Sequence, residues 1–201
     1  YFKNLIIKII FYLYYKKADI RIGNSKKVSN DIEKFTSSKT ISIYPCPIKK
    51  INKNRSKKTT IKKNFTLLWV GRLSKEKSFN TLINAIFLIK KLNTKIFVVG
   101  DGPEKKNIMI KLKKLKISHK FKFFGFKENV NKFYKYSDLY ISTSLYEGFQ
   151  NTLIEAMNNN LPIICSKSHG CSQELLLNGK LGSIYNINDH YQLSNIIKKF
   201  I

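Results

Sequence analysis

The sequence predicts an α/β protein whose parallel β-sheet is covered by helices on both faces. Between residues 64 and 201, short apolar runs typical of strands alternate with longer runs whose apolar residues recur at helical spacing. The run 66–70 is almost continuously apolar, as expected of a strand that is buried on both faces. Glycine-containing turns follow several of these runs. Because strands alternate with helices, the sheet is expected to be parallel.

The first 48 residues predict a small group of elements that precedes this sheet. Apolar residues over 2–13 recur at helical spacing with lysines between them, which indicates an amphipathic helix. We interpret its apolar face first as a surface that packs onto a further domain, and second as a membrane-surface helix. Three short elements follow: a strand within 18–25, a helix over 29–35 and a strand over 41–44.

A linker is expected over 49–63. Pro45 and Pro47 fix the backbone and stop the preceding strand, and the linker residues are rich in Lys, Asn, Ser and Thr. We therefore divide the chain into 1–48, the linker, and a domain over 64–201 that is truncated at its end. The chain has no initiating Met and opens inside a helical pattern, so we expect a fragment of a longer protein.

The domain over 64–201 contains six expected strands separated by helices. The strands are expected over 66–70, 95–99, 121–124, 139–142, 161–165 and 182–185. The helices are expected over 79–89, 103–116, 129–136 and 189–200, with further ones beginning near residues 150 and 174. Ser78 is a suitable N-cap for the first of these helices.

The chain is strongly basic, with 38 Lys and Arg against 12 Asp and Glu and a net charge of +26. Such an excess attracts nucleic acid or an anionic membrane surface. Lys, Asn and Ile are abundant throughout, as translation of an AT-rich genome gives, and the lysines form no recognition motif with aromatic residues. Compositional drift is therefore the first interpretation, attraction to an anionic membrane surface the second, and nucleic-acid binding a distant third. Drift and membrane attraction are compatible.

The composition indicates neither a metal site nor a membrane span. The chain has three cysteines, an odd number, and their spacing is neither that of zinc ligands nor that of a disulfide framework: Cys46, Cys165 and Cys171. The three histidines are dispersed along the sequence. No apolar run reaches the roughly 18 residues that a membrane span needs, and no signal-peptide cleavage site is visible. We expect a cytoplasmic protein without metal or cofactor. Peripheral attachment to the inner face of the membrane is compatible with this expectation.

Residues 137–157 combine an expected strand, a polar turn and an expected helix. The turn Glu147-Gly148-Phe149 follows the carboxyl end of the strand, where ligands bind in open α/β sheets. Gly148 allows main chain to approach a ligand without interference from a Cβ atom. Taken alone, such a turn is also typical of an ordinary loop.

The helix that follows this turn adds two features. The amides of Gln150, Asn151 and Thr152 open the helix, where an anion is favoured. Glu147 in the loop and Glu155 on the helix flank the turn, eight positions apart. Glutamates on a helix are also common on a solvated face, so the neighbouring motifs decide the interpretation.

The stretch 137–157 resembles the E-x7-E signature of the retaining GT-B glycosyltransferases of family 4, the glycosyl transferases group 1. Three further motifs occur in the family's order: Val-Gly-Arg-Leu at 70–73 with Glu76-Lys77, Val-Gly-Asp-Gly-Pro at 99–103, and Phe-Gly-Phe at 124–126. Together they cover roughly residues 64 to 200. The resemblance implies a Rossmann-like C-terminal domain that binds a nucleotide-sugar donor. It also implies that 1–48 is the end of an N-terminal, acceptor-side domain.

The resemblance implies roles for four charged residues. Arg72 and Lys77 match the pair that stabilises the departing nucleoside diphosphate, whose charge grows in the transition state. Glu155 matches the carboxylate that accepts hydrogen bonds from the ribose hydroxyls. Glu147 matches the carboxylate near the donor sugar, which we expect to stabilise positive charge at the anomeric carbon. Double displacement with a carboxylate nucleophile and a front-side mechanism both stay open, and the second is preferred for the family.

Further residues are expected to contact the donor, chiefly through their main chain. They are Gly71, Phe126, Gly148, Phe149, Gln150 and Asn151. Trp69 and the other strand aromatics are assigned to the core. No DxD pattern occurs, so no divalent metal is implied. The chain departs from the family's usual pattern at Ser78, where Gly is common, and at Gln150 and Cys171, where Pro is frequent.

We therefore expect a retaining glycosyltransferase that moves a sugar, most often from a UDP-sugar, to a glycan or lipid-linked acceptor in cell-envelope polysaccharide biosynthesis. Two alternatives remain: a basic nucleic-acid-binding α/β module, and a catalytically degenerate transferase with a structural role. The acceptor site falls outside this chain. The fragment alone is expected to bind the donor weakly and to turn over little.

Overall fold

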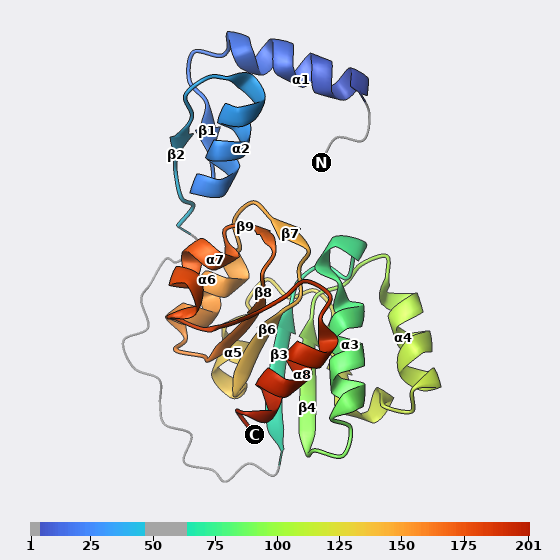
Figure 1. Ribbon diagram of the computed structural model, residues 1–201. Coiled ribbons are helices and arrows are strands. Elements are labelled where there is room, and N and C mark those ends of the chain that lie inside the picture. Colours follow the sequence, from blue (N-terminus) through green and yellow to red (C-terminus); the bar gives the residue numbers. More distant parts are fainter. Residues whose placement is uncertain (1–4, 47–63) are drawn as a thin grey trace. The chain divides into compact units, whose positions relative to one another are not determined.

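The computed structural model describes residues 5–46 and 64–201, so the expected linker lies outside the described residues. The chain divides into two compact units, Tyr1–Cys46 and Pro47–Ile201. Each unit is described by itself below (Figure 1).

Unit 1 contains two helices and two very short strands. They are α1 Leu5–Lys17, β1 Ile22–Gly23, α2 Lys26–Thr36 and β2 Ile41–Ser42, and the two strands pair in parallel. Helix α2 begins earlier than expected because Ser25 caps it, with its Oγ accepting a hydrogen bond from the Val28 amide at 3.3 Å. Helix α1 has no buried residue within the described structure.

Unit 2 is built on a six-stranded sheet in the order β10-β8-β6-β3-β4-β5, and every neighbouring pair is parallel. The strands are β3 Phe65–Val70, β4 Thr94–Val99, β5 Phe121–Phe123, β6 Leu139–Ser142, β8 Ile163–Ser166 and β10 Ser183–Tyr185. This confirms the predicted fold class. A separate two-stranded ladder pairs β7 Tyr146–Glu147 with β9 His169–Gly170.

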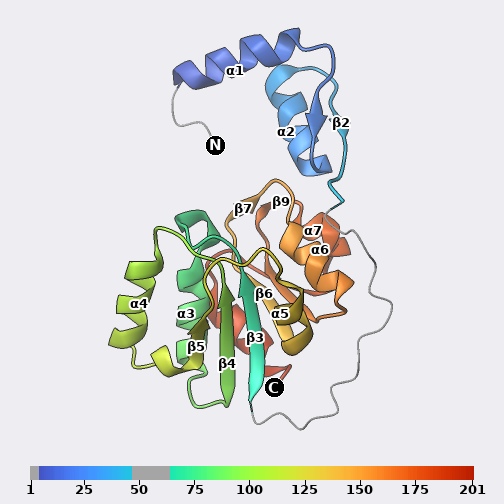
Figure 2. The same cartoon turned by 180° about the vertical axis from the view of Figure 1, so that it is seen from behind.

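Helices cover both faces of this sheet. Helices α3 Phe79–Leu88, α4 Lys105–Lys114 and α8 His190–Lys198 supply buried residues to one core cluster. Helices α5 Asn131–Tyr136 and α6 Asn151–Asn158 supply the other cluster, next to the short α7 Ser172–Leu175, and Figure 2 shows α5 and α6 from behind. Over residues 64–201 there are also three short 3-10 helices: η1 Lys75–Lys77, η2 Ser118–Lys120 and η3 Leu177–Gly179.

The apolar strand β3 explains why two cores are possible. Leu67 and Trp69 point into the cluster beneath α3, while Leu68 points into the opposite cluster. Since successive side chains of a strand face opposite sides, a continuous apolar run fills both layers. Burial of each such side chain contributes about 1.5–3 kcal/mol relative to exposure.

Helix α3 begins differently from the expectation. Ser78 precedes it but makes no side-chain cap hydrogen bond, and its φ of 43° and ψ of 44° are left-handed. Its hydroxyl instead contacts Thr81 Oγ1 and Asn188 Oδ1, each at 2.9 Å. The expected N-cap is therefore wrong as a capping interaction. Asp189 does cap α8, because its Oδ1 accepts a hydrogen bond from the Gln192 amide at 2.8 Å.

Gly100 allows three strand ends to meet. Its φ is +131°, and a Cβ atom at this position would lie 1.8 Å from the Gly71 carbonyl oxygen. The Gly100 amide donates to the Gly125 carbonyl at 2.8 Å, and the Gly71 amide donates to Val99 at 3.0 Å. The chain segments that leave β3, β4 and β5 are thus held together at the carboxyl edge of the sheet.

We expect Gly100→Ala to destabilise unit 2 far more than Gly125→Ala. Both glycines have positive φ, but a Cβ at Gly125 meets nothing within 4 Å. The strain of placing alanine at a positive φ lowers the free energy of unfolding by about 1–2 kcal/mol. At Gly100 the clash of the new Cβ atom should raise this loss of stability above about 3 kcal/mol. Urea unfolding followed by the fluorescence of Trp69, the single tryptophan, measures both losses. Equal losses for the two variants would contradict the assignment of close packing at Gly100.

Candidate active site

A cavity of about 420 Å³ opens at the carboxyl edge of the sheet, where β3 and β4 end. It is lined by Val70, Gly71, Arg72, Val99, Gly100, Asp101, Phe126, Lys127 and Val130. Ligands of open α/β sheets bind at this edge. Gly71, Arg72 and Phe126, three of the residues expected to bind a donor, therefore line one cavity. The side chain of Phe126 is 73% exposed, so its ring is accessible.

The loop after β3 is fixed by main-chain hydrogen bonds to the loop after β4. The Leu73 amide donates to the Asp101 carbonyl at 2.9 Å, and the Glu104 amide donates to the Leu73 carbonyl at 2.9 Å. Arg72 is exposed on this loop and forms no ion pair within residues 5–46 and 64–201. The Ser74 hydroxyl donates to Glu76 and holds the pKa of that carboxyl below its ordinary value. The main chain that carries Arg72 is therefore held at the wall of the cavity.

Lys77 and Glu147 meet although they lie 70 positions apart in sequence. The Lys77 ammonium donates to Glu147 Oε1, and the Ser144 hydroxyl donates to the same oxygen at 2.8 Å. The two charged side chains are only 23% and 15% exposed. Partial burial strengthens such a charge-assisted pair. Ser144 was not among the expected site residues, because a serine in a polar turn carries no distinctive signal.

Glu147 lies in strand β7 rather than in an irregular loop. It pairs with Gly170 of β9, whose φ is +127°. A Cβ atom at Gly170 would lie 1.5 Å from the Glu147 carbonyl oxygen. Gly170 is thus required for the close contact that holds the main chain of Glu147.

Gln150 differs from its expected role as a donor of a main-chain amide to the ligand. Its amide donates to Cys171 Sγ at 3.2 Å, and its side chain is buried between Ser142 and Cys165. Burial raises the pKa of the Cys165 thiol to about 12 and that of Cys171 to about 11, so both stay protonated at neutral pH. The side chain of Gln150 therefore joins β6 to β8, and its main-chain amide joins them to the β9–α7 turn.

The neighbouring residues of this turn keep other positions. Gly148 is exposed and Phe149 is half-buried, and Asn151 is the exposed first residue of α6. The structure thus places Gly148 and Asn151 at the solvent-facing side of the turn that follows Glu147.

Glu155 is held by a tyrosine from a different helix. The Tyr134 hydroxyl, on α5, donates to Glu155 Oε2 at 2.8 Å and also lies 3.1 Å from the Thr152 carbonyl oxygen. Burial raises the pKa of Glu155 above its ordinary value, and the hydrogen bond from Tyr134 opposes that shift. The sequence pattern placed Tyr134 on a helix but carried no signal for this contact, because the two residues are 21 positions apart.

Tyr140 connects the two glutamates electrostatically. Burial raises its pKa strongly, and the negative charges of Glu147 and Glu155 raise it further. Its hydroxyl donates to Thr152 Oγ1 at 2.7 Å. The negative charges of both carboxylates of the expected signature therefore act on one buried phenol.

Two absences concern the part of the chain that the structure describes. Within residues 5–46 and 64–201, no group of three or more His, Cys, Asp or Glu side chains is arranged to hold a metal ion. Over the same residues, none of the helices combines the length and the apolarity needed to cross a membrane.

Comparisons with known proteins agree on one family. The family model described as "Glycosyl transferases group 1" matches residues 50–201. The chain is 26% identical over 207 residues to an N-acetylgalactosaminyltransferase of Campylobacter jejuni that acts on a diphospho-undecaprenol substrate, covering all of this chain and 55% of the relative. It is 30% identical over 191 residues to an uncharacterized glycosyltransferase of Methanocaldococcus jannaschii, covering 88% of this chain and 47% of the relative. The chain thus spans about half the length of the curated relatives it matches.

Solved structures show the same fold. Anabaena HepE in complex with UDP and glucose has a TM-score of 0.83 and 24% identity, covering 98% of this chain and 57% of HepE. The lipopolysaccharide outer core galactosyltransferase WaaB has a TM-score of 0.74 and 23% identity, covering 92% of this chain and 53% of WaaB. These neighbours are GT-B glycosyltransferases, in agreement with the Rossmann-like architecture of unit 2.

We expect Glu155→Gln to stabilise the protein at neutral pH. A carboxyl whose pKa is raised by folding holds its proton longer in the native state, so its contribution to stability falls as the pH rises from its unfolded pKa through its folded pKa. The glutamine keeps an oxygen that accepts the Tyr134 hydrogen bond but removes the charge. The midpoint of thermal unfolding should rise by about 1–3 °C at pH 7 and stay unchanged near pH 4.

The matched control is Glu128→Gln, which removes the same charge from an exposed loop. It should leave the midpoint nearly unchanged at both pH values. A stabilisation by Glu128→Gln equal to that by Glu155→Gln would assign the effect to net charge and not to the burial of Glu155.

Proposed function

The chain belongs to the glycosyl transferases group 1 family, and from this premise we propose that it is the donor-binding part of a retaining glycosyltransferase of family 4. Unit 2 would hold a nucleotide-sugar, and unit 1 would be the end of the acceptor-side domain. The observation that carries the proposal is the ion pair between Lys77 and Glu147, together with Arg72, which precedes Lys77 on the same loop and lines a cavity at the carboxyl edge of the sheet.

The two cations fit the leaving group of a nucleotide-sugar. Breaking the bond between the anomeric carbon and the diphosphate places growing negative charge on the phosphate oxygens. Arg72 lines the cavity and Lys77 lies on the next turn of the same loop, so both can approach those oxygens. Fixed cations stabilise this charge without reorganisation at the moment of reaction.

The surroundings of Glu147 favour front-side substitution. Its Oε1 already accepts hydrogen bonds from Lys77 and Ser144, which reduces its strength as a nucleophile. In the proposed step the carbon–oxygen bond to the diphosphate breaks, and the acceptor oxygen bonds to the anomeric carbon from the same face. The acceptor proton passes to the departing phosphate oxygen. Glu147 then serves to stabilise positive charge at the anomeric carbon.

Glu155 and the cavity fit the nucleoside. A carboxylate accepts two hydroxyl protons at once and so suits the vicinal diol of a ribose. The hydrogen bond from Tyr134 leaves Glu155 Oε1 available for such a contact. Phe126 and the main chain of the adjoining loop line the cavity where a base would lie. Gly71, Gly148, Phe149 and Asn151 remain proposed main-chain contacts of the donor.

The donor is proposed to be a UDP-sugar and the acceptor a glycan or a lipid-linked glycan of the cell envelope. Several solved neighbours contain UDP, among them HepE and the Staphylococcus aureus protein TarM. A relative in Rhizobium meliloti is described as a lipopolysaccharide core biosynthesis glycosyltransferase. No metal and no cofactor is assigned to the reaction.

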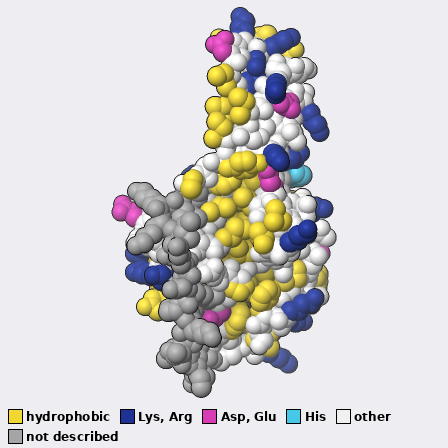
Figure 3. Space-filling model, turned by 90° about the vertical axis from the view of Figure 1, so that its left-hand side faces the viewer, with side chains coloured by type: hydrophobic (Ala, Val, Ile, Leu, Met, Phe, Trp, Pro, Cys, Tyr) yellow, Lys and Arg dark blue, Asp and Glu magenta, His cyan; other side chains and the backbone are white. Residues whose placement is uncertain are grey.

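The basic surface fits a cytoplasmic protein that associates peripherally with an anionic membrane, where lipid-linked acceptors occur. Figure 3 shows Lys and Arg side chains spread over one face, with hydrophobic side chains between them, and not gathered into a single groove. A dispersed distribution gives weak attraction to anionic lipid. It does not favour the alternative function, recognition of a nucleic acid along a defined track.

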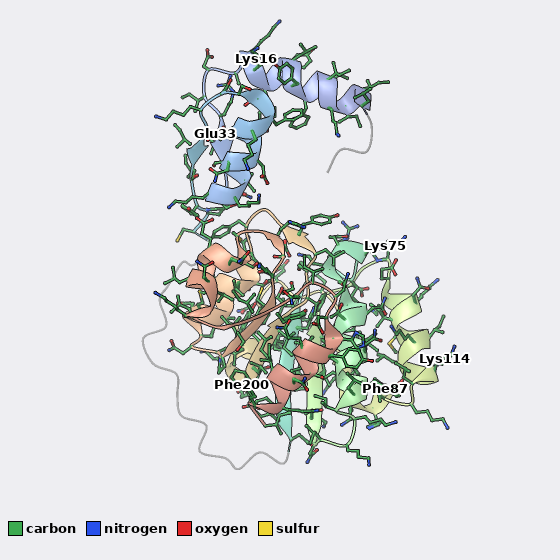
Figure 4. The ribbon with its side chains drawn as sticks, in the orientation of Figure 1. Lys16, Glu33, Lys75, Phe87, Lys114 and Phe200 are labelled. Atoms are coloured by element: carbon green, nitrogen blue, oxygen red, sulfur yellow. The ribbon has the colours of Figure 1, made fainter. Side chains whose placement is uncertain are left out.

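We expect the full-length protein to bind UDP more tightly than GDP or ADP in calorimetric titrations. Arg72→Ala, Lys77→Gln and Glu155→Ala should each weaken binding about 10- to 100-fold, since hydrogen bonds to charged groups contribute about 1.5–3 kcal/mol. The control Lys75→Gln removes a cation from the same 3-10 helix, where the side chain points outward (Figure 4). It should change binding less than about threefold, because exposed charges contribute little.

Three outcomes would contradict the proposal. Equal losses for Lys75→Gln and Lys77→Gln would mean that nucleotide is held by net charge alone. Binding of nucleic acid without nucleotide selectivity, falling steeply with salt and unaffected by Glu155→Ala, would favour the nucleic-acid alternative. Selective UDP binding without transfer from any UDP-sugar would favour a degenerate transferase with a structural role.

A further inference from the structure

A buried chain of hydrogen bonds runs from the core to the main chain of Lys77. The Trp69 indole N–H, on β3, donates to Thr143 Oγ1 at 3.1 Å. The Thr143 hydroxyl, directly after β6, donates to the Lys77 carbonyl oxygen at 2.6 Å. Trp69 and Thr143 are each 2% exposed, and Trp69 packs edge-on against Phe79 with ring centroids 4.8 Å apart.

The chemistry of these groups decides which of them donates and which accepts each hydrogen bond. An indole nitrogen can only donate, and a hydroxyl carries a single proton. Thr143 must therefore accept from Trp69 and give its own proton to Lys77. Because Trp69 and Thr143 are buried, loss of the hydroxyl leaves the indole N–H without its acceptor and the Lys77 carbonyl without this donor. The hydroxyl is thus held in one orientation by the core.

The loop after β3, which carries Lys77, and the loop after β6, which carries Thr143, are joined at two further points. The Leu145 amide donates to the Glu76 carbonyl at 2.8 Å, and the Lys77 ammonium reaches Glu147. Of these three contacts, the hydrogen bond from Thr143 is the one that holds the main chain of Lys77 itself.

The residue after Lys77 is constrained as well. Ser78 keeps a left-handed conformation, which is strained for a residue other than glycine. Its contacts with Thr81 and Asn188 hold it in place. The main chain of Lys77 is therefore held at its carbonyl group by Thr143 and at the following residue by Ser78.

We propose that Thr143 is a positioning residue for the transfer reaction: its hydroxyl, oriented by Trp69, holds the main chain of Lys77 where the ammonium group meets both Glu147 and the diphosphate of the donor. A lysine side chain has a flexible four-carbon stem and therefore loses much rotamer entropy when its ammonium group is held in one place. Fixing its main chain confines the ammonium before the donor arrives, which is the preorganisation that stabilisation of a leaving group needs. The catalytic part of this inference rests on the proposed function, while the placement of Lys77 does not.

The decisive pair of variants is Thr143→Val and Thr143→Ser in the full-length enzyme. Valine has nearly the same shape but makes neither hydrogen bond, whereas serine keeps both. We expect Thr143→Val to lower kcat about 10- to 100-fold with a smaller change in KM for the donor, since the lost contact acts on the transition state. Thr143→Ser should recover most of the loss.

Two comparisons separate positioning from a purely structural role. Ser137→Ala removes another buried hydroxyl that donates to a carbonyl, that of Phe133 at 2.7 Å, at the amino end of β6. It should lower stability without lowering kcat. In a Lys77→Gln background, Thr143→Val should cause no further loss of kcat, because both changes remove the same interaction. Additive losses, or an unchanged kcat in Thr143→Val, would overturn the inference.

A readout without substrate tests the placement of Lys77 alone. The coupling between Lys77 and Glu147 is measured by urea unfolding of Lys77→Gln, Glu147→Gln and the double variant. The coupling should fall by at least half in the presence of Thr143→Val and persist with Thr143→Ser. Trp69 is the single tryptophan, so one indole N–H resonance reports loss of its hydrogen bond. Absence of transfer in the wild type would refute the proposed function, whereas an unchanged coupling would refute the positioning of Lys77.

Discussion

Contact between main chains at the carboxyl edge of the sheet is the constraint on which the candidate site depends. Gly100 lies against the Gly71 carbonyl group, and Gly170 lies against the Glu147 carbonyl group, each where no Cβ atom fits. The first contact places the loop that carries Arg72 beside the cavity, and the second fixes the strand that carries Glu147. Charged side chains from distant parts of the sequence can therefore converge without any of them belonging to the core.

The sequence predicted the fold well because its signals are local and repeated. Strand β6 lies at its predicted bounds, and the continuous apolar run of β3 faces two cores as expected. The structure deviates from the prediction where a cap or a turn decides the boundary of an element. Helix α2 was predicted to begin at Ser29, but it begins at Lys26 because Ser25 caps it. Such a choice depends on which hydroxyl can reach a free amide, and the apolar pattern does not encode it.

The sequence predicted the charged members of the site but not the groups that hold them. Arg72 and Lys77 were recognisable by motif, whereas Tyr134 contacts Glu155 from another helix and Thr143 contacts Lys77 across 66 positions. Gln150 shows the opposite error, since its place in the motif suggested a ligand contact and its burial gives it a structural one. Contacts between side chains of different elements depend on the three-dimensional register of the sheet, which a linear motif does not specify.

The Lys77–Glu147 pair also explains how a highly basic chain can keep a carboxylate and a cation ready in one place. Without a donor, the ammonium is neutralised by Glu147 and partly shielded from water. A diphosphate that approaches Lys77 would meet a group already desolvated and oriented, so less ordering remains to be done on binding. Glu147 would keep the hydrogen bond from Ser144 at the same oxygen while it shares the ammonium with the phosphate. In the proposed reaction, positive charge developing at the anomeric carbon would increase the attraction to Glu147 while Lys77 is drawn toward the departing diphosphate, so one ion pair would serve both developing charges.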